Sequence, residues 1–229
     1  EAADVLVIGG GGAGLRAALA AVEKEPSARV LLLTKGKLGQ AGVTARACSD
    51  RMAFHVALEH TEPGGPDNWK YHAQDVYRIG GCVSDGDLAA LQAAEARLAF
   101  AYLDRLGVPF VKRPDGRAEQ FVTDGSDYAR ACYTGPHTAN HIHQALLRQL
   151  RTTPVGVLEE TMLADLLTDD AGRCVGALCL TDLDRSRPAW LAIAARAVIL
   201  ATGGAGELFA VNVFPEGMTG DGYAAALRA

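Results

Sequence analysis

The chain begins with two short apolar runs that are separated by a segment of helical character. Residues 5–8 and 29–33 are dominated by valine, leucine and isoleucine, which is typical of strands buried in a parallel sheet. The alanine-rich residues 15–21 between them have strong helix propensity. The pattern therefore predicts a strand, a helix and a second strand at the start of the chain.

Helical spacing dominates the middle of the chain, where we predict helices over residues 68–79 and 138–150. A longer helix follows Ser84 or Asp85, either of which can cap its first turn. Its apolar residues recur every three or four positions, as on the buried face of an amphipathic helix, at Leu88, Leu91, Ala94, Leu98, Tyr102 and Leu106. Two connecting segments are predicted to be irregular loops, namely residues 36–47 and 112–135.

Short strand-like runs return in the last third of the chain. Four of them are joined by turns and predict an antiparallel meander over residues 155–158, 162–167, 174–180 and 190–193. Another apolar run, residues 197–201, predicts the last strand of the core. The chain is thus predicted to form one α/β domain over residues 1–229, with a helical insertion at about 68–150 and a β-meander at about 155–195.

Glycines follow the first strand directly, in the spacing Gly9-x-Gly11-x-x-Gly14. Gly9 permits a tight turn, Gly11 lets the backbone approach a pyrophosphate, and Gly14 lets the helix pack closely on the strand. The helix N-terminus then offers free N–H groups and partial positive charge to phosphates. This strand–turn–helix context favours a Rossmann-like dinucleotide site, and a plain glycine-rich turn is the alternative.

The ends of two further strands bear on the ligand. Nicotinamide folds usually carry Asp or Glu after the second strand, for the adenosine ribose. Here that strand ends in Thr34 and Lys35, which argues against ordinary NAD binding. Residues 202–204, Thr-Gly-Gly, follow the last predicted strand, where glycines can let a ligand approach the sheet or simply form a tight turn.

Composition excludes several classes of partner. A net charge of −5 and a pI near 5.7 give no reason to expect nucleic acid or an anionic membrane as a ligand. No apolar run approaches the length of a membrane span, and no leader sequence is evident. Five scattered cysteines without a CxxC pair indicate reduced thiols in a cytoplasmic protein.

Six sequence blocks, in order, resemble the flavoprotein subunits of succinate dehydrogenase and fumarate reductase, with L-aspartate oxidase and adenylylsulfate reductase as relatives. The resemblance covers nearly the whole chain. The blocks that carry it are residues 7–19, Thr34-Lys35, Asp67-Asn68-Trp69, residues 106–110, residues 201–206 and Thr219-Gly220-Asp221-Gly222.

The resemblance implies FAD bound in an extended form across the sheet. The pyrophosphate would lie against Gly9, Gly10, Gly11, Gly12, Ala13 and Gly14. The adenosine would lie near Thr34, Lys35, Met162 and Leu163. Asp221 would bind the ribityl chain. The loop that wraps the pyrophosphate and reaches the isoalloxazine would contain Gln40, Ala41, Gly42, Val43 and Thr44, and the final strand would contribute Ala201, Thr202, Gly203 and Gly204.

Each assignment has a structural alternative. Thr34 and Lys35 can be a solvated strand end, and Met162 and Leu163 can be core residues. Asp221 precedes a helical run and can act as a cap or first-turn acid, which is compatible with holding a polyol.

Two departures from the family's pattern affect the expected chemistry. Gly42 stands about where membrane-bound members carry the histidine that bonds covalently to flavin, so the resemblance implies non-covalent FAD. Arg46-Ala47-Cys48-Ser49 replaces the Ala-Gln-Gly-Gly beside the flavin, which puts dicarboxylate specificity in doubt.

The resemblance places the catalytic acid and the carboxylate-binding residues in a capping domain beyond Ala229, so no catalytic residue is assigned. The implied activity is hydride transfer between flavin N5 and a small carboxylic or dicarboxylic acid. Two alternatives are an oxidase of the aspartate-oxidase kind and a non-catalytic flavin subunit. The second of these needs a partner chain. The expected partners are a small-molecule substrate and a second subunit that transfers electrons or caps the substrate, and such a subunit could associate this protein with a membrane.

Histidines give no metal prediction. His137, His141 and His143 have helical spacing, but no carboxylate accompanies them. His55, His60 and His72 have no partner that the sequence identifies.

Overall fold

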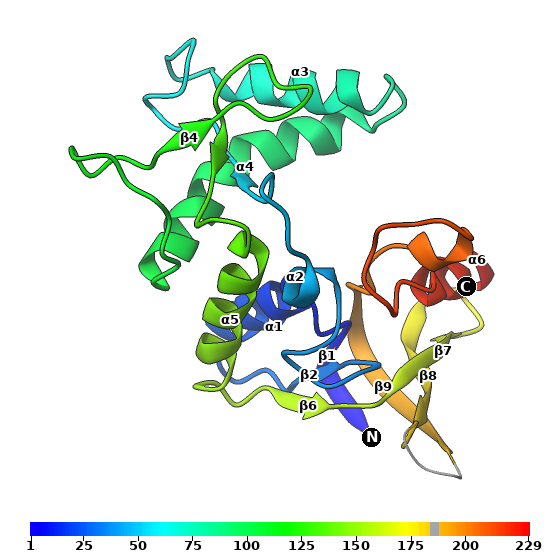
Figure 1. The fold of residues 1–229 in the computed structure, drawn as a ribbon. Helices are drawn as coiled ribbons and strands as arrows, with labels where there is room; N and C mark the ends of the chain where they lie inside the picture. Colours follow the sequence, from blue (N-terminus) through cyan, green and yellow to red (C-terminus); the bar gives the residue numbers. More distant parts are fainter. Residues whose placement is uncertain (184–187) are drawn as a thin grey trace. The chain divides into compact units, whose positions relative to one another are not determined.

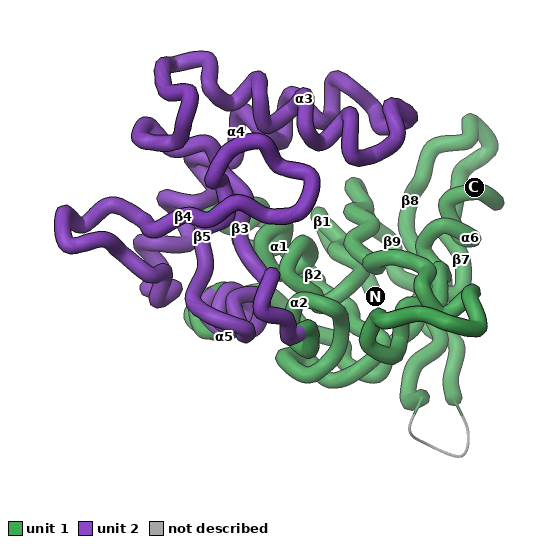
Figure 2. Tube along the Cα trace, turned by 45° about the horizontal axis from the view of Figure 1, so that its top comes forward, with its two compact units in different colours: residues 1–47, 146–229 green, residues 48–145 purple. Residues whose placement is uncertain are grey.

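The structure is a computed structural model that describes residues 1–183 and 188–229 (Figure 1). The chain forms two compact units, coloured separately in Figure 2. One unit comprises residues 1–47 and 146–229, and the other comprises residues 48–145. The chain passes from one unit to the other after Ala47 and again inside helix α5 (Thr138–Leu150). Among the helices in the described part of the chain, none has both the length and the apolar character required to cross a bilayer.

A six-stranded sheet in the order β6-β2-β1-β9-β8-β7 forms the centre of the first unit. The first four strands in that order are mutually parallel, and β8 and β7 continue the sheet antiparallel. The strands are β1 (Ala2–Ile8), β2 (Val30–Leu33), β6 (Gly156–Leu158), β7 (Met162–Thr168), β8 (Cys174–Thr181) and β9 (Ala189–Leu200). The predicted α/β fold, a parallel sheet with an antiparallel ribbon, is confirmed.

The register of the parallel strands aligns their carboxyl ends. Ile8 at the end of β1 pairs with Leu33 of β2 on one side and with Leu200 of β9 on the other. The glycine turn, Thr34 and Ala201 therefore leave the sheet at one edge. Ligands of open α/β sheets bind at this carboxyl edge.

Helices of the first unit follow the strands. After β1 comes α1 (Gly12–Lys24), and α2 (Val43–Arg46) lies in the predicted loop after β2. A short 3-10 helix, η1 (Gly206–Leu208), and α6 (Asp221–Arg228) follow β9. The sequence did not predict α2, because one helical turn is too short to show periodicity.

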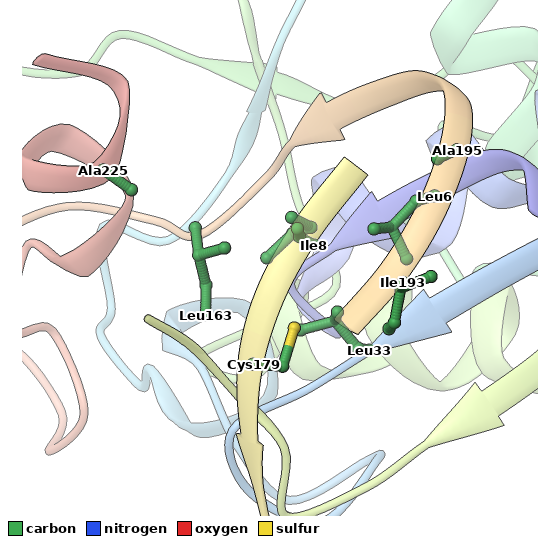
Figure 3. Packing of buried hydrophobic residues seen from close by; sticks show 9 residues of the cluster. Leu6, Ile8, Leu33, Leu163, Cys179, Ile193, Ala195 and Ala225 are labelled. Carbon is green, nitrogen blue, oxygen red and sulfur yellow. The ribbon is translucent and has the colours of Figure 1, made fainter. Parts of the chain in front are cut away.

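One hydrophobic core joins the parallel strands to the antiparallel ribbon (Figure 3). Ile8 and Leu33 come from the parallel strands, Leu163 and Cys179 come from β7 and β8, and Ala225 comes from α6. All of them are almost completely buried. The ribbon is therefore part of the same packed unit.

Two strand predictions are wrong. The runs at 190–193 and 197–201 form the single strand β9, because Ala194 pairs with Gly176 of β8 and with Ala2 of β1. Partners on both sides hold the strand extended through its alanines. The run at 155–158 does not open the meander, since β6 pairs parallel with β2.

The second unit contains the helices α3 (Trp69–Ile79) and α4 (Gly86–Arg105), which pack on each other. Its small sheet consists of β3 (Phe54–His55), β5 (Ala131–Cys132) and β4 (Gln120–Phe121), in that order. The prediction that residues 112–135 are wholly irregular is therefore wrong. Two-residue strands depend on tertiary pairing and carry no period that a sequence can reveal.

The buried face of α4 is also not the predicted one. Asp85 caps the helix by accepting a hydrogen bond from Leu88 N at 3.0 Å, as predicted. Leu88, Leu91 and Leu98 are 63, 58 and 68% exposed, however. The buried positions are instead Ala89, Ala93, Ala96, Phe100 and Leu103.

Candidate cofactor site

A cleft of about 740 Å³ opens at the carboxyl edge of the sheet, within the first unit. Its volume lies in the range of small-molecule and cofactor sites. Of the sequence-predicted site residues, Gly14 and Gly204 do not line it. The predicted residues that do are Gly9, Gly10, Gly11, Gly12, Ala13, Thr34, Lys35, Gln40, Ala41, Gly42, Val43, Thr44, Met162, Leu163, Ala201, Thr202, Gly203 and Asp221.

The glycines of the first turn fall into two kinds. Gly9 has φ +121°, and a Cβ there would lie 2.1 Å from the Ala201 carbonyl oxygen. A Cβ on Gly14 would lie 1.7 Å from the Gly9 carbonyl oxygen. A Cβ on Gly11 would meet no protein atom within 4 Å, although Gly11 lines the cleft. Gly9 and Gly14 thus let the chain pack on itself, while Gly11 keeps space open for a ligand.

The N-terminus of α1 borders the cleft through Gly12 and Ala13. Its N-cap residue Gly11 offers no side chain to the first N–H groups of the helix. Such a terminus combines backbone donors with partial positive charge, which suits a phosphate or pyrophosphate.

A polar cluster joins β2 to α6 at one end of the cleft. The Lys35 ammonium lies 2.8 Å from a carboxylate oxygen of Asp221 and also donates to the hydroxyl of Thr219. The Thr219 hydroxyl donates to the same carboxylate at 2.8 Å. Partial burial raises the pKa of Asp221, but the hydrogen bonds from Lys35 and Thr219 and the charge of Lys35 outweigh it and hold that pKa below its usual value. Asp221 is therefore an ionised acceptor at neutral pH.

The loop after β2 lies against the glycine turn. Gly42 has φ +89° and precedes α2, and a Cβ placed on it would lie 3.7 Å from the Cα of Gly11. A Cβ on Gly12 would lie 2.9 Å from the Thr44 methyl. The loop and the start of α1 thus pack together, so both can contact one ligand.

Several cleft residues were missed by the sequence reasoning. They include Lys37, Thr161, Glu216, Met218 and Tyr223, whereas Arg46, which the resemblance places beside the flavin, also lines the cleft. Thr161 directly precedes the predicted Met162, and Glu216 and Met218 directly precede the Thr-Gly-Asp-Gly block. Their position next to predicted site residues is the sequence signal that could have identified them.

The histidines of α5 do not form a metal site in the residues that the structure describes. His141 Nδ1 is 2.7 Å from the hydroxyl of Thr134, and His143 is fully buried. His60 Nε2 is 3.0 Å from the Ala118 carbonyl oxygen, so it has a partner that the sequence does not reveal.

Comparison with known proteins bears on the ligand. A family described as FAD binding domain matches residues 4–229. An uncharacterized FAD-dependent oxidoreductase of Methanocaldococcus jannaschii is 33% identical over 224 residues, which are 97% of this chain and 39% of that protein. One component of the CoM/CoB fumarate reductase of Methanothermobacter marburgensis is 31% identical over 226 residues, which are 99% of this chain and 39% of that protein.

Solved structures agree with the sequence comparison. A structure of Escherichia coli quinol fumarate reductase superposes with a TM-score of 0.87 at 27% identity, covering 100% of this chain and 37% of that one. The chain thus spans less than two fifths of the length of each of these three relatives. The chain belongs to the FAD binding domain family, among the flavoproteins of the fumarate reductase and succinate dehydrogenase type, and its cofactor is FAD.

Proposed function

We propose that this chain holds FAD in extended form in the cleft, as the redox part of an oxidoreductase that acts on a small carboxylic acid. The observation that carries the proposal is the unfilled space above Gly11, next to the open N-terminus of α1. A pyrophosphate has the size and charge for that space. The relatives' names support the redox role, since they include fumarate reductases.

Residue roles follow from the positions along the cleft. The backbone N–H groups of residues 11–13 would hold the pyrophosphate, and Thr34, Lys35, Met162 and Leu163, which also line the cleft, would hold the adenosine. Because Lys35 contacts Asp221, both residues would border the same part of the cleft, the part that holds the adenosine. We therefore assign Asp221 to the adenosine ribose, and no longer to the ribityl chain. Asp221, at the start of α6, would then do what the Asp or Glu after the second strand does in nicotinamide folds.

Flavin supplies a hydride acceptor or donor at N5 when it is bound. The chain's part is to orient the ring, through the loop with Ala41 and Val43 and through the glycines after β9, and to keep water from one of its faces. The loop residues 40–44 include no histidine, cysteine or tyrosine that could attach to flavin, which supports non-covalent FAD. We assign no residue of this chain as the proton donor. We also assign no residues to contact with a second subunit, which would close the site or carry electrons.

An absorption spectrum of the purified chain, before and after acid precipitation, tests the proposal. We expect flavin bands before precipitation and their full release into the supernatant afterwards. Flavin that stays with the precipitate would contradict non-covalent binding. A chain that binds no FAD on reconstitution would overturn the function itself. Succinate with an artificial acceptor, compared with L-aspartate and oxygen, separates a dehydrogenase from an oxidase.

Gly11→Ala is expected to weaken FAD binding by about tenfold or more, because its methyl would occupy the space of the pyrophosphate. Gly11 has φ −77°, which alanine accepts, so the thermal midpoint of the apoprotein should not change. Gly86→Ala is the matched control, since a Cβ there also meets no atom within 4 Å but lies in α4. Equal FAD affinity in both variants, measured by fluorescence titration, would show that the space is not used.

Asp221→Asn is expected to weaken binding of ADP-ribose several-fold, equivalent to about 1 kcal/mol, because a charged acceptor for ribose hydroxyls is lost. Competition of ADP-ribose against FAD measures the effect. The matched control is Asp165→Asn, whose carboxylate is bound by Arg228 at 3.3 Å and does not line the cleft. If Asp221→Asn weakens FAD but leaves ADP-ribose unchanged, the residue contacts the ribityl chain instead.

A further inference from the structure

Two segments of the first unit carry opposite charges where the cleft meets solvent. Arg46 is the last residue of α2, and Glu216 belongs to the segment between η1 and α6. Both line the cleft, and Arg46 Nη1 lies 3.9 Å from Glu216 Oε2. Their side chains are 47 and 86% exposed, so the pair stands at the mouth of the cleft.

The guanidinium of Arg46 is only loosely engaged. A distance of 3.9 Å is about 1 Å longer than a charge-assisted hydrogen bond to a carboxylate. An exposed ion pair of this kind contributes about 1 kcal/mol at most. Lys35, by contrast, is held at 2.8 Å by Asp221. Arg46 can therefore exchange Glu216 for another carboxylate at little cost.

Arg46 lies toward the part of the cleft that we assign to the flavin ring. The cleft crosses the sheet from Lys35 after β2, past Gly9 after β1, to Gly203 after β9. A Cβ on Gly203 would lie 3.4 Å from the sulfur of Met218, so the segment that contains Glu216 meets the β9 side. The adenosine end with Lys35 is on the opposite side of β1.

We propose that Arg46 binds a carboxylate group of the substrate at the mouth of the cleft, and that Glu216 occupies its place when substrate is absent. This inference rests on the proposed function. The guanidinium presents a planar pair of donors that matches a carboxylate, and the carboxylate of Glu216 already shows that the position admits one. The substrate is therefore an anion, and Arg46 is a residue that selects it.

The test is a titration of the FAD-loaded chain with malonate, a dicarboxylate that flavin does not oxidise, followed by the change in flavin absorbance. We expect Arg46→Gln to raise the malonate Kd roughly tenfold or more, because a charge-assisted pair is lost. Arg46→Lys should fall between this variant and the parent chain, since it keeps the charge but not the paired donors. Glu216→Gln should lower the Kd, because the competing carboxylate is removed.

Arg16→Gln is the matched control, since the Arg16 side chain is 42% exposed, forms an ion pair with Glu23 at 2.9 Å and does not line the cleft. It should leave the malonate Kd unchanged, and all four variants are titrated with malonate after saturation with FAD. Malonate binding that is absent, or that is unaffected by Arg46→Gln, overturns the inference while FAD binding stands. Failure of the parent chain to bind FAD would instead overturn the proposed function, and calorimetry with the apoprotein would still test malonate.

Discussion

Gly14→Ala is expected to destabilise the first unit by about 3 kcal/mol or more, although alanine is the better helix former. A methyl on Gly14 would lie 1.7 Å from the Gly9 carbonyl oxygen, which is backbone and cannot rotate away. The start of α1 would have to move away from the end of β1, which would displace the glycine turn that lines the cleft. Thermal denaturation followed by far-UV circular dichroism should show a midpoint lower by roughly 6 to 12 °C.

Gly12→Ala is the graded control for this prediction. Its Cβ would lie 2.9 Å from a methyl of Thr44, a side chain that can change rotamer. We expect a much smaller loss of stability, because the Thr44 side chain can rotate away from the new methyl, whereas the Gly9 carbonyl cannot. Equal midpoints for Gly14→Ala and the parent chain would contradict the close packing of helix on strand. Equal losses in the two variants would show that the effect is not specific to the backbone contact.

The glycine turn is where sequence reasoning succeeded, because each glycine answers a local requirement. Gly9 must adopt φ +121°, and Gly14 must lie against the Gly9 carbonyl oxygen. Both requirements arise within six residues, so the spacing alone carries the information. Strands β1 and β2 could also be predicted from the sequence, since a run of branched apolar residues is typical of a strand that is buried on both faces.

The buried face of α4 shows where such reasoning fails. Large apolar residues marked one stripe of the helix, and Leu88 and Leu98 lie on it. The helix instead turns its alanines, such as Ala89 and Ala93, toward the core of its unit, where small side chains let α3 and α4 pack closely. Hydrophobic spacing finds a helix, but the choice between two apolar faces depends on the partner.

The ion pair between Arg46 and Glu216 was missed for a related reason. Arg46 and Glu216 are 170 positions apart in sequence and meet only because α2 and the segment before α6 border one cleft. No motif with a fixed spacing contains both residues. Contacts between distant segments follow from the register of β1, β2 and β9, which no single segment encodes.

The second unit contains a buried charge that the sequence also did not reveal. Arg130 is 1% exposed and forms an ion pair with Asp75, which is itself buried. His72, on α3, is 4% exposed, and the centroid of its ring is 6.4 Å from that of His55. Its Nδ1 atom has no hydrogen-bond partner within the described chain. Burial, then the charge of Arg130, and then His55 lower the pKa of His72 to about 4.

We therefore expect the second unit to lose stability as the pH falls from about 6.5 toward 4. The unfolded chain takes up a proton on His72 near pH 6.5, while the folded chain resists it down to a pKa of about 4. Proton uptake by the unfolded state therefore lowers the free energy of unfolding as the pH falls through this window. Above about pH 6.5, His72 causes no such loss. The shift corresponds to a loss of about 3 kcal/mol at the acid end. The lowered pKa of His55, caused by burial and then by Arg130, acts in the same direction.

Trp69, the first residue of α3, can report on this unit alone once the exposed Trp190 of β9 is replaced by phenylalanine. Urea denaturation followed by its fluorescence, between pH 7.5 and 4.5, should give midpoints that fall steeply with acid. His72→Gln removes the titrating group and should flatten the profile, even if it lowers the midpoint at neutral pH. His137→Gln, at an exposed position, should leave the slope as it is in the parent chain. A slope that His72→Gln does not change would show that other groups, the carboxylates first among them, cause the acid sensitivity.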